Sequence, residues 1–238
     1  YVHPSSTSYD PVIDAGSYVY EAEVSGGIVK NPHKGFVMTV DDQWDFKSTN
    51  RYGVGGSLNN RAWDVCSVCC MAPFWKNLNP ADGVYNWSSI DAVLEECERN
   101  GMTLGIRIIP YSTSIGDDSN RGKAHDLVPD YVYSERGARH TTATWRWDRS
   151  RPAIDVPDWS DPNYIQAFKD FARALAEKYD NDPRVEFIDV RPFGNWGEWH
   201  TTEWIGSDMP SLEIMTGHLF LKENGTFQSI NKRLPVVV

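Results

Sequence analysis

The sequence has 238 residues, 40% of them hydrophobic and 24% charged, which is typical of a globular chain with one large domain or two small ones. The net charge of −10, without a basic cluster, argues against nucleic acid and anionic membrane surfaces as partners. No apolar run approaches the roughly 18 residues that span a bilayer, and no cofactor motif is present. We therefore predict neither a membrane segment nor a cofactor.

The chain begins at Tyr1, with neither an initiator Met nor a signal-peptide pattern. Two acceptor patterns for N-glycosylation occur, at Asn86 and at Asn224. We expect a secreted, periplasmic or cell-surface glycoprotein. Residues 1–30 are predicted to be an irregular N-terminal segment, and residues 31–238 to be a domain of the catalytic type.

Short apolar runs alternate with amphipathic segments in this domain. Residues 34–40 and 65–75 are predicted strands. Residues 88–101 form an amphipathic helix, in which Ser88 and Asp91 resemble a capping box and Gly101 supplies the C-terminal stop. The apolar face of this helix consists of Ile90, Val93, Leu94 and Cys97.

Residues 102–110 follow as a third strand. Residues 111–161 show no clear periodicity and are predicted to form a long loop, which is uncommon in a domain unless the loop has a function. Asp161 and Pro162 then open a second helix, with an N-cap followed by proline at the first helical position. The predicted buried stripe of this helix is Ile165, Phe168, Phe171, Ala172, Leu175 and Tyr179.

A fourth strand lies within residues 181–193, a further helix within 211–230 and a fifth strand within 233–238. Apolar strands that alternate with helices predict a parallel sheet buried on both faces. No glycine-rich phosphate loop follows any strand, which removes the usual nucleotide-binding case for a doubly wound sheet. Arg107, Asp189 and Arg191 alternate with aliphatic residues in the third and fourth strands, which suits a barrel interior. We predict an α/β fold of the TIM (βα)8-barrel type, of which this chain supplies the first four to five βα units.

The cysteines suggest a structural role. Cys66 and Cys69 have the spacing of a metal pair, but they lie in a predicted strand that points them to opposite faces, so we predict no metal site. Buried free thiols, among them Cys70, or one disulfide to Cys97 are the two alternatives.

Ten tryptophans and eleven tyrosines raise the question of sugar binding, because aromatic faces on loops suit flat, partly apolar ligands. Filling of the core is the other interpretation for each of them. Barrel enzymes assemble their sites at the carboxyl ends of the strands. The candidates at these ends are Trp75, Arg107, Tyr111, Arg191 and the run "GNWGEWH", residues 194–200.

Four segments carry a resemblance to a known family: "NPHKGF", "APFWKNLNPADGVYNWSSIDAVLEECERNGMTLGIRIIPY", "VPDWSDPNYIQAFKDFARALAEKYDNDPRVEFIDV" and "GNWGEW". Together they resemble the β-galactosidase-like glycoside hydrolases of the large retaining barrel clan. The nearest members are glycoside hydrolase family 42 and related uncharacterised polysaccharide-degrading proteins. The resemblance covers residues 31–200, and its most specific part is the run over residues 75–91.

The resemblance implies that Glu198 is the general acid/base and that Asn195 contacts a sugar 2-hydroxyl. The clan usually has this Asn and Glu adjacent, whereas two residues separate them here. Burial against Trp196 and Trp199 would raise the pKa of Glu198, and nearby arginines would oppose that rise. The two tryptophans would stack on pyranose faces, and His200 could hydrogen-bond a hydroxyl. Arg107 and Arg191 either contact the substrate or only fill the barrel in an ion-pair network with Asp189.

The function implied is that of a retaining glycosidase for galactose-containing or related poly- or oligosaccharides. The clan places the nucleophile at the end of strand seven, which this sequence does not reach. We therefore expect a C-terminal half, or a second copy in a homo-oligomer, to complete the barrel. The alternative is a non-catalytic carbohydrate-binding or structural barrel. An isomerase or aldolase is disfavoured, because the strand ends offer no Schiff-base lysine and no phosphate-binding glycine loop.

Overall fold

The computed structural model describes residues 37–41, 66–116, 118–189, 191–211, 214 and 236–237. Its main feature is a five-stranded parallel sheet, in which the strands lie in the order β1, β2, β3, β6 and β8. These strands are Val37–Asp41, Val68–Ala72, Thr103–Arg107, Val185–Asp189 and Val236–Val237.

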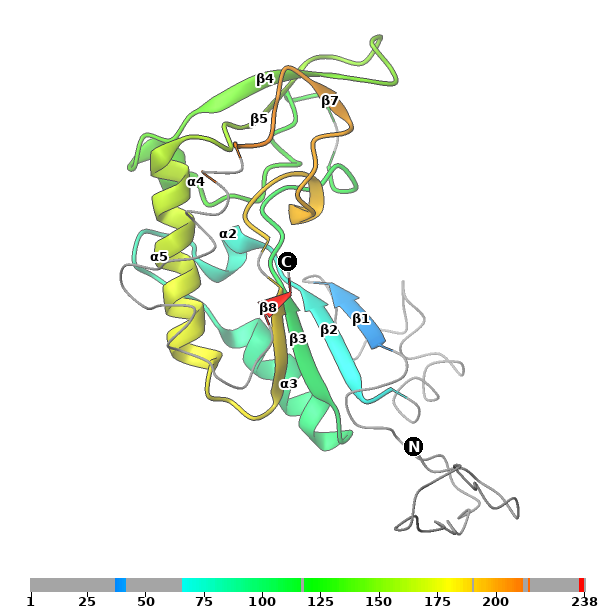
Figure 1. Ribbon diagram of the computed structural model, residues 1–238, viewed down its shortest axis with the longest axis vertical. Helices are drawn as coiled ribbons and strands as arrows, with labels where there is room; N and C mark the ends of the chain where they lie inside the picture. The colour runs from blue at the N-terminus through cyan, green and yellow to red at the C-terminus, as the bar shows by residue number, and fades with distance from the viewer. Residues whose placement is uncertain are drawn as a thin grey trace, which may run out of the picture.

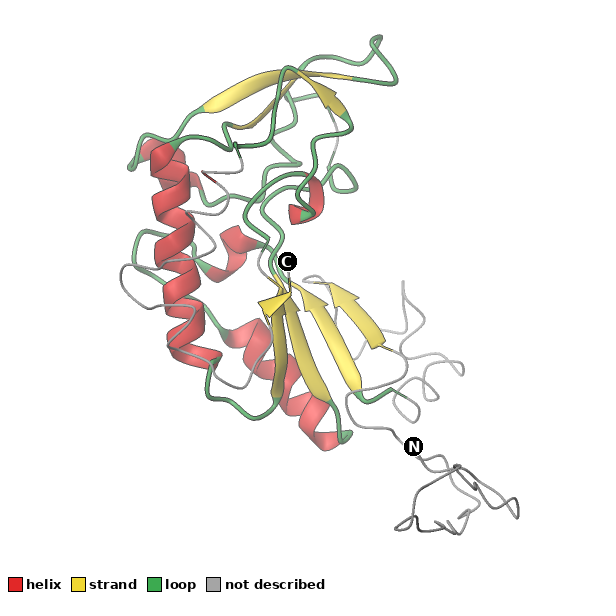
Figure 2. Ribbon diagram, in the orientation of Figure 1, coloured by secondary structure: helices red, strands yellow, loops and turns green. Residues whose placement is uncertain are grey.

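The order of these strands in space is their order along the chain. A doubly wound sheet reverses its order at a switch point, whereas a (βα) barrel adds each new strand to the same edge. The predicted α/β fold is therefore confirmed as a partial barrel of the TIM type. The two long helices, α3 (Ser88–Arg99) and α5 (Pro162–Tyr179), both lie on one side of the sheet (Figures 1 and 2).

Helix α3 buries the four predicted residues and ends before Gly101, whose φ of 62° is in the left-handed region. The predicted capping box is wrong. Asn86 Oδ1 accepts hydrogen bonds from the Ser88 amide at 3.2 Å and the Ser88 hydroxyl at 2.7 Å, so the capping group precedes the helix. Asp91 instead accepts a hydrogen bond at 2.8 Å from the hydroxyl of Tyr179, which joins α3 to the end of α5.

Helix α5 begins as predicted. Asp161 accepts hydrogen bonds from the backbone amides of Asn163 at 2.8 Å and Tyr164 at 3.3 Å, which satisfies two of the free donors of the first turn. Pro162 occupies the first helical position, where no backbone donor is needed. All six residues of the predicted apolar stripe are buried.

The two faces of the sheet carry different side chains. Leu104, Ile106 and Ile188 belong to the core cluster that contains the buried residues of α3 and α5. The opposite, inner face carries Arg107 and Asp189, which are register partners. This separation confirms the predicted alternation of charged and aliphatic residues, with the charged ones at the carboxyl ends of β3 and β6.

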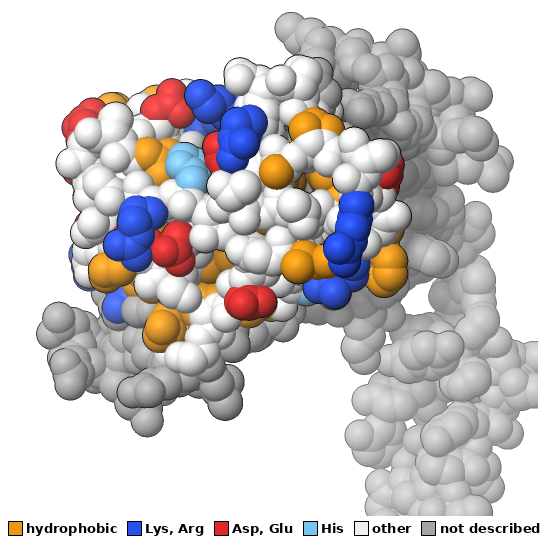
Figure 3. Space-filling model, turned by 90° about the horizontal axis from the view of Figure 1, so that it is seen from above, with side chains coloured by type: hydrophobic (Ala, Val, Ile, Leu, Met, Phe, Trp, Pro, Cys, Tyr) orange, Lys and Arg blue, Asp and Glu red, His pale blue; other side chains and the backbone are white. Residues whose placement is uncertain are grey.

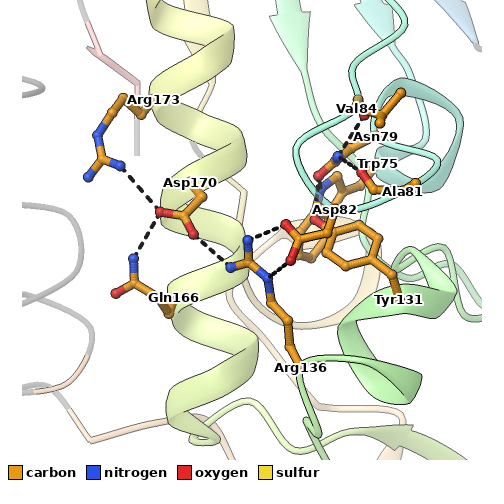
Figure 4. Close-up of polar contacts among 10 residues, drawn as sticks. All are labelled: Trp75, Asn79, Ala81, Asp82, Val84, Tyr131, Arg136, Gln166, Asp170 and Arg173. Atoms are coloured by element: carbon orange, nitrogen blue, oxygen red, sulfur yellow. Dashed lines mark hydrogen bonds and ion pairs between the residues drawn. The ribbon is translucent and has the colours of Figure 1, made fainter.

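The run over residues 75–91 forms a compact loop between β2 and α3, together with the first turn of α3 (Figure 4). It begins with the short helix α2, Trp75–Leu78. The buried Asn79 organises the loop, because its Oδ1 accepts from Trp75 Nε1 and from the Tyr131 hydroxyl, while its Nδ2 donates to two carbonyl groups of the loop. Gly83 has a φ of 68° at the turn. The most specific part of the family resemblance thus has a structural role.

Residues 111–161 are not a structureless loop, and that prediction is wrong. They contain helix α4 (Asp130–Ser134) and strands β4 (His140–Trp145) and β5 (Ile154–Pro157). Strand β4 pairs antiparallel with β5 and with β7 (Trp204–Ile205). This second sheet lies beyond the carboxyl ends of the parallel strands, above them in Figure 1.

The four cysteines are buried free thiols, as the first alternative predicted. Hydrogen bonding between the thiols of Cys69 and Cys97, together with burial, raises the pKa of Cys69. None of the described helices is long and apolar enough to cross a membrane. The irregular segment 1–30, the acceptor at Asn224 and almost all of the helix expected within 211–230 lie outside the described residues.

Candidate active site

The run "GNWGEWH" forms a tightly wound loop directly after β6. Within it, the backbone amide of Asn195 donates to the carbonyl of His200 at 2.9 Å, and the amide of Trp199 donates to the carbonyl of Phe193 at 3.1 Å. Trp196 and Trp199 have φ values of 52° and 58°, a region that larger residues rarely adopt. Backbone strain of this kind persists where the surrounding structure enforces it, and it concentrates at functional sites.

Two glycines make this loop possible. A Cβ on Gly194 would lie 2.5 Å from the backbone oxygen of His200, and a Cβ on Gly197 would lie 2.5 Å from Cβ of Arg191. Both glycines also have positive φ values, of 82° and 69°. The backbone can therefore turn at Gly194 and Gly197 because only glycine fits there. Glu198 directly follows Gly197.

A charged network lies at the carboxyl ends of β3 and β6. Asp189 Oδ2 accepts from Arg107 Nε at 2.8 Å and from Arg191 Nε at 2.6 Å. Glu198 Oε1 lies 3.3 Å from Arg191 Nη2 and 3.7 Å from Arg107 Nη2. The network therefore alternates two carboxylates with two guanidinium groups.

Arg191 is the centre of the network. Its side chain is 7% exposed, and its Nη1 donates to the carbonyl of Trp196 at 2.8 Å, which ties the network to the strained loop. Arg107 is 32% exposed and faces the inner side of the sheet. The predicted alternative of an ion-pair network with Asp189 is confirmed for both arginines, and nothing in this geometry tests whether they also contact a substrate.

Burial changes the acidity of two groups on this face. It raises the pKa of Asp189, and the Glu198 charge adds to the rise, while the hydrogen bond and the charge of Arg107 oppose it. Burial also raises the pKa of the Cys70 thiol to about 11, again against the opposing effect of Arg107. Cys70 is therefore a neutral thiol on the inner face.

His200 lies between two carboxylates. Its Nε2 is 3.9 Å from Glu198 Oε2, and its Nδ1 is 3.4 Å from Glu203 Oε2. The hydroxyl of Thr202 is 2.9 Å from the same Nδ1. The Thr202 hydroxyl therefore orients the imidazole, which has one carboxylate at ion-pair distance on either side.

Glu198 itself is 43% exposed. Trp196 lies against His200, with ring centroids 5.9 Å apart, and Trp199 packs edge-on against Phe193. The predicted burial of Glu198 by the two tryptophans is therefore wrong, and their rings contact His200 and Phe193 instead. Both tryptophans are partly exposed.

Two predicted substrate-binding residues belong to the core instead. Trp75 is completely buried, with its ring 5.1 Å from that of Phe168. Tyr111 is also completely buried, with its ring 5.2 Å from that of Trp204. Neither side chain presents a face to a ligand, so the prediction that they bind substrate is wrong, and the space-filling interpretation of their aromatic rings is correct.

Asn195 is completely buried as well. Its Oδ1 accepts from the backbone amide of Thr113 at 3.0 Å, and its Nδ2 donates to the Thr113 hydroxyl at 2.9 Å. The predicted contact with a sugar 2-hydroxyl is therefore corrected to a structural link between the loops after β3 and β6. Ser114 strengthens the link, because its hydroxyl accepts from Trp196 Nε1 at 3.1 Å.

Sequence reasoning missed three contributors to this site, namely Thr113, Ser114 and Glu203. All three are small or charged residues in segments without periodicity. The fold brings Thr113 and Ser114 to the strained loop, whereas Glu203 follows the loop closely in the sequence. No group of three or more His, Cys, Asp or Glu side chains that could hold a metal ion occurs within the described ranges.

No family model matches the chain, and no curated protein matches it. Among solved structures, it is similar to a β-galactosidase from the psychrophilic Marinomonas ef1, with 14% identity and a TM-score of 0.46 over 83% of this chain and 28% of that one. Xylanase B from Clostridium stercorarium F9 gives 11% identity and a TM-score of 0.42 over 84% and 50% of the two chains. The catalytic domain of a β-amylase from Paenibacillus polymyxa has 13% identity and a TM-score of 0.43, over 55% of this chain and 30% of that one.

The chain thus spans between 28% and 50% of the length of these three proteins. Because the identities and TM-scores are low, the assignment of the fold depends on the strand order described above. Membership of glycoside hydrolase family 42 stays a prediction.

Proposed function

We propose that this chain is part of a glycoside hydrolase in which Glu198 is the general acid/base. One observation carries the proposal: a partly exposed glutamate follows the fourth strand of a partial (βα) barrel, on a strained loop that also presents Trp196 and Trp199. The carboxyl ends of the strands are where such barrels hold their active sites. Cleavage of a glycosidic bond needs a carboxylic acid that reaches the leaving oxygen.

The neighbours of Glu198 suit this role. Arg191 Nη2 lies 3.3 Å from Oε1, so the carboxyl group has a defined direction, while Oε2 points toward His200 Nε2 at 3.9 Å. Asp189 does not fit the role of nucleophile, because it is buried and its Oδ2 accepts from two guanidinium groups. In a retaining mechanism a second carboxylate would lie about 5–5.5 Å from Glu198, and we propose that a later barrel strand supplies it.

The substrate is proposed to be a galactose-containing or related poly- or oligosaccharide, and the protein to act outside the cytoplasm, as a secreted, periplasmic or cell-surface glycoprotein. Asn86, the acceptor that the structure describes, is exposed at the start of α3. A further C-terminal segment or a second copy of the chain would complete the barrel.

The test is hydrolysis of a broad glycan panel by the protein that carries this chain, read as released reducing sugar. Glu198→Gln is expected to lower the rate by about a hundredfold or more, since general acid–base catalysis contributes that much. The matched control is Glu177→Gln, an exposed glutamate on α5. Absence of hydrolysis on every glycan, or full activity of Glu198→Gln, would refute the proposal.

A non-catalytic carbohydrate-binding barrel is the second candidate. It is favoured by the position of Glu198 Oε1 near both Arg191 and Arg107, which is the arrangement of a charge held in an ion-pair network. Such a protein would bind glycans in calorimetry without turnover, and its affinity would survive Glu198→Gln.

A further inference from the structure

The hairpin between β4 and β5 projects an unusual set of side chains. Residues 146–152 are all exposed, and Trp147 is the most exposed large hydrophobic residue that the structure describes, at 82%. A single exposed apolar side chain needs no explanation in general. Trp147, however, has arginines on both sides, at positions 146 and 149, in a chain with a net charge of −10.

These two arginines are not neutralised by the described part of the chain. The guanidinium group of Arg146 donates to the carbonyl of Thr202 at 2.8 Å and to the carbonyl of Trp204 at 2.9 Å. No described carboxylate pairs with it. Arg149 forms no ion pair with any described residue. The positive charges beside Trp147 are therefore available to an external anion.

The rest of the hairpin serves to hold this tip in place. Asp148 accepts hydrogen bonds from the backbone amide of Ser150 at 3.1 Å and from its hydroxyl at 2.5 Å, which closes the turn. Arg151 pairs with Asp118 at 2.5 Å, and its guanidinium lies 3.6 Å from the ring centre of Trp145. These hydrogen bonds lower the pKa of Asp148, which therefore stays ionised at the tip, while the charge of Arg151 is used in its pair with Asp118 outside the hairpin. Two arginines, Arg146 and Arg149, against one aspartate leave the tip cationic.

The tip is connected to the candidate active site. The backbone amide of Arg146 donates to the carbonyl of Glu203 at 2.8 Å, and Glu203 in turn lies 3.4 Å from His200, the neighbour of Glu198. Figure 3 views the molecule from the side of this second sheet and shows cationic and hydrophobic side chains next to one another on its surface.

We propose that Trp147 and Arg149 form a binding subsite for a polysaccharide that carries carboxylate or sulfate groups. The indole ring stacks on the apolar face of a pyranose, and the guanidinium group binds the anionic substituent, to which its planar donors are matched. Arg146 adds positive charge and fixes the tip. This inference rests on the proposed function in one respect, namely that the ligand is a glycan. Binding at the subsite does not require hydrolysis and can be measured without it.

The experiment is titration calorimetry on the protein that carries this chain, with Glu198→Gln present throughout so that the ligand is not degraded. The three probes are polygalacturonate, a sulfated galactan and a neutral galactan. The variants are Trp147→Ala, Trp147→Phe and Arg149→Gln, and the control is Arg99→Gln, which removes an exposed arginine of α3 on the far side of the molecule.

We expect binding of at least one anionic polysaccharide, which Trp147→Ala and Arg149→Gln each weaken by about tenfold, while Trp147→Phe keeps part of the affinity. Binding should also weaken as the salt concentration rises, and less so in Arg149→Gln, since exposed charges are screened by salt. The preference between polygalacturonate and the sulfated galactan identifies the anionic group. Equal affinity of Trp147→Ala and the parent, or equal affinity for the neutral and the anionic galactans, overturns the inference.

The two proposals fail in different ways. Binding that depends on Trp147 without hydrolysis by the protein with native Glu198 would leave the subsite standing and remove the hydrolase. If Glu198→Gln abolishes hydrolysis while Trp147→Ala has no effect on binding, the hydrolase proposal stands and the subsite is refuted. Near-ultraviolet circular dichroism of each variant shows whether the hairpin change has disturbed the fold.

Discussion

The carboxamide of Asn195 forms two hydrogen bonds with Thr113. Its Oδ1 accepts from the Thr113 amide at 3.0 Å, and its Nδ2 donates to the Thr113 hydroxyl at 2.9 Å. The two residues belong to the loops after β3 and β6, so this pair sets the distance between the loops. Because Asn195 is completely buried, neither of its polar atoms has access to water if the partner is lost. The position of Glu198, three residues further on, therefore depends on this contact.

Asn195→Ala is expected to lower the free energy of unfolding by about 2 kcal/mol, because it removes the two hydrogen bonds of a completely buried side chain and leaves the Thr113 amide without this partner. Thr113→Ala removes the hydroxyl and the γ-methyl group but keeps the backbone amide, and it should cost about 1 kcal/mol. Urea unfolding of both single variants and of the double variant measures the coupling. A double variant whose loss equals the sum of the single losses would contradict a direct contact between the two side chains.

Gly197→Ala should destabilise the protein by about 3 kcal/mol, because the added Cβ combines a positive φ with overlap of the backbone. That Cβ would lie 2.8 Å from the carbonyl oxygen of Arg191, which cannot move without shifting the end of β6. Gly83→Ala is the matched control. Its φ of 68° is nearly the same as the 69° of Gly197, but nothing lies within 4 Å of the added Cβ.

For Gly83→Ala only the conformational cost remains, about 1 kcal/mol. Thermal unfolding of the two variants gives the comparison directly. Equal losses would show that the close packing at Gly197 is not what makes glycine necessary there.

Periodicity was sufficient to predict the elements that pack the core. The spacing of apolar residues identified α3 and α5, and Asp161 followed by Pro162 located the start of α5, because such patterns report contacts within one helix. The short apolar runs likewise marked the strands of the parallel sheet. Both signals are local, because each can be recognised from residues that are close together in the sequence.

The second sheet escaped prediction for the same reason. Strand β4, "HTTATW", buries only Ala143 and Trp145, so its alternation is nearly invisible in hydrophobicity, and its partner β7 contributes two residues from far along the chain. The core positions of Trp75 and Tyr111 were also missed, because strand-end location alone does not tell whether a ring points to the ligand or to a neighbouring helix. The position of the strained loop was predicted correctly, but its shape was not, since no sequence rule places tryptophan at positive φ.

Arg191→Lys should cost more than Arg107→Lys. Arg191 is buried and contacts Asp189, Glu198 and the carbonyl of Trp196 at once, and a lysine ammonium cannot reproduce that planar arrangement. We expect a loss of about 2–4 kcal/mol for Arg191→Lys, because a buried pair is broken, and below about 1 kcal/mol for the more exposed Arg107→Lys. Chemical unfolding compares the two, and equal losses would contradict the central place of Arg191.

The last prediction concerns the ion pairs that hold the loop of residues 75–91 against α5 (Figure 4). Arg136 pairs with Asp82 in that loop and, at 2.6 Å, with Asp170 on α5. The hydrogen bond from Arg136 lowers the pKa of Asp82. A carboxylate whose pKa is lower in the folded state stabilises the fold above its unfolded pKa, and this contribution is lost as the pH falls through the folded pKa.

Arg136→Gln should therefore destabilise the protein near neutral pH by up to about 1 kcal/mol, a small value because both partners are partly exposed. The difference from the parent should stay constant above the ordinary aspartate pKa of 3.8 and shrink only below it, as the pH falls through the lowered pKa of Asp82 in the folded parent. Urea unfolding across this pH range measures it, with Arg99→Gln as the control, since Arg99 pairs only within α3 among the described residues. A difference that stays constant with pH would mean that Arg136 stabilises the loop by packing on Tyr131, whose ring centre lies 5.6 Å away, and not through its charge.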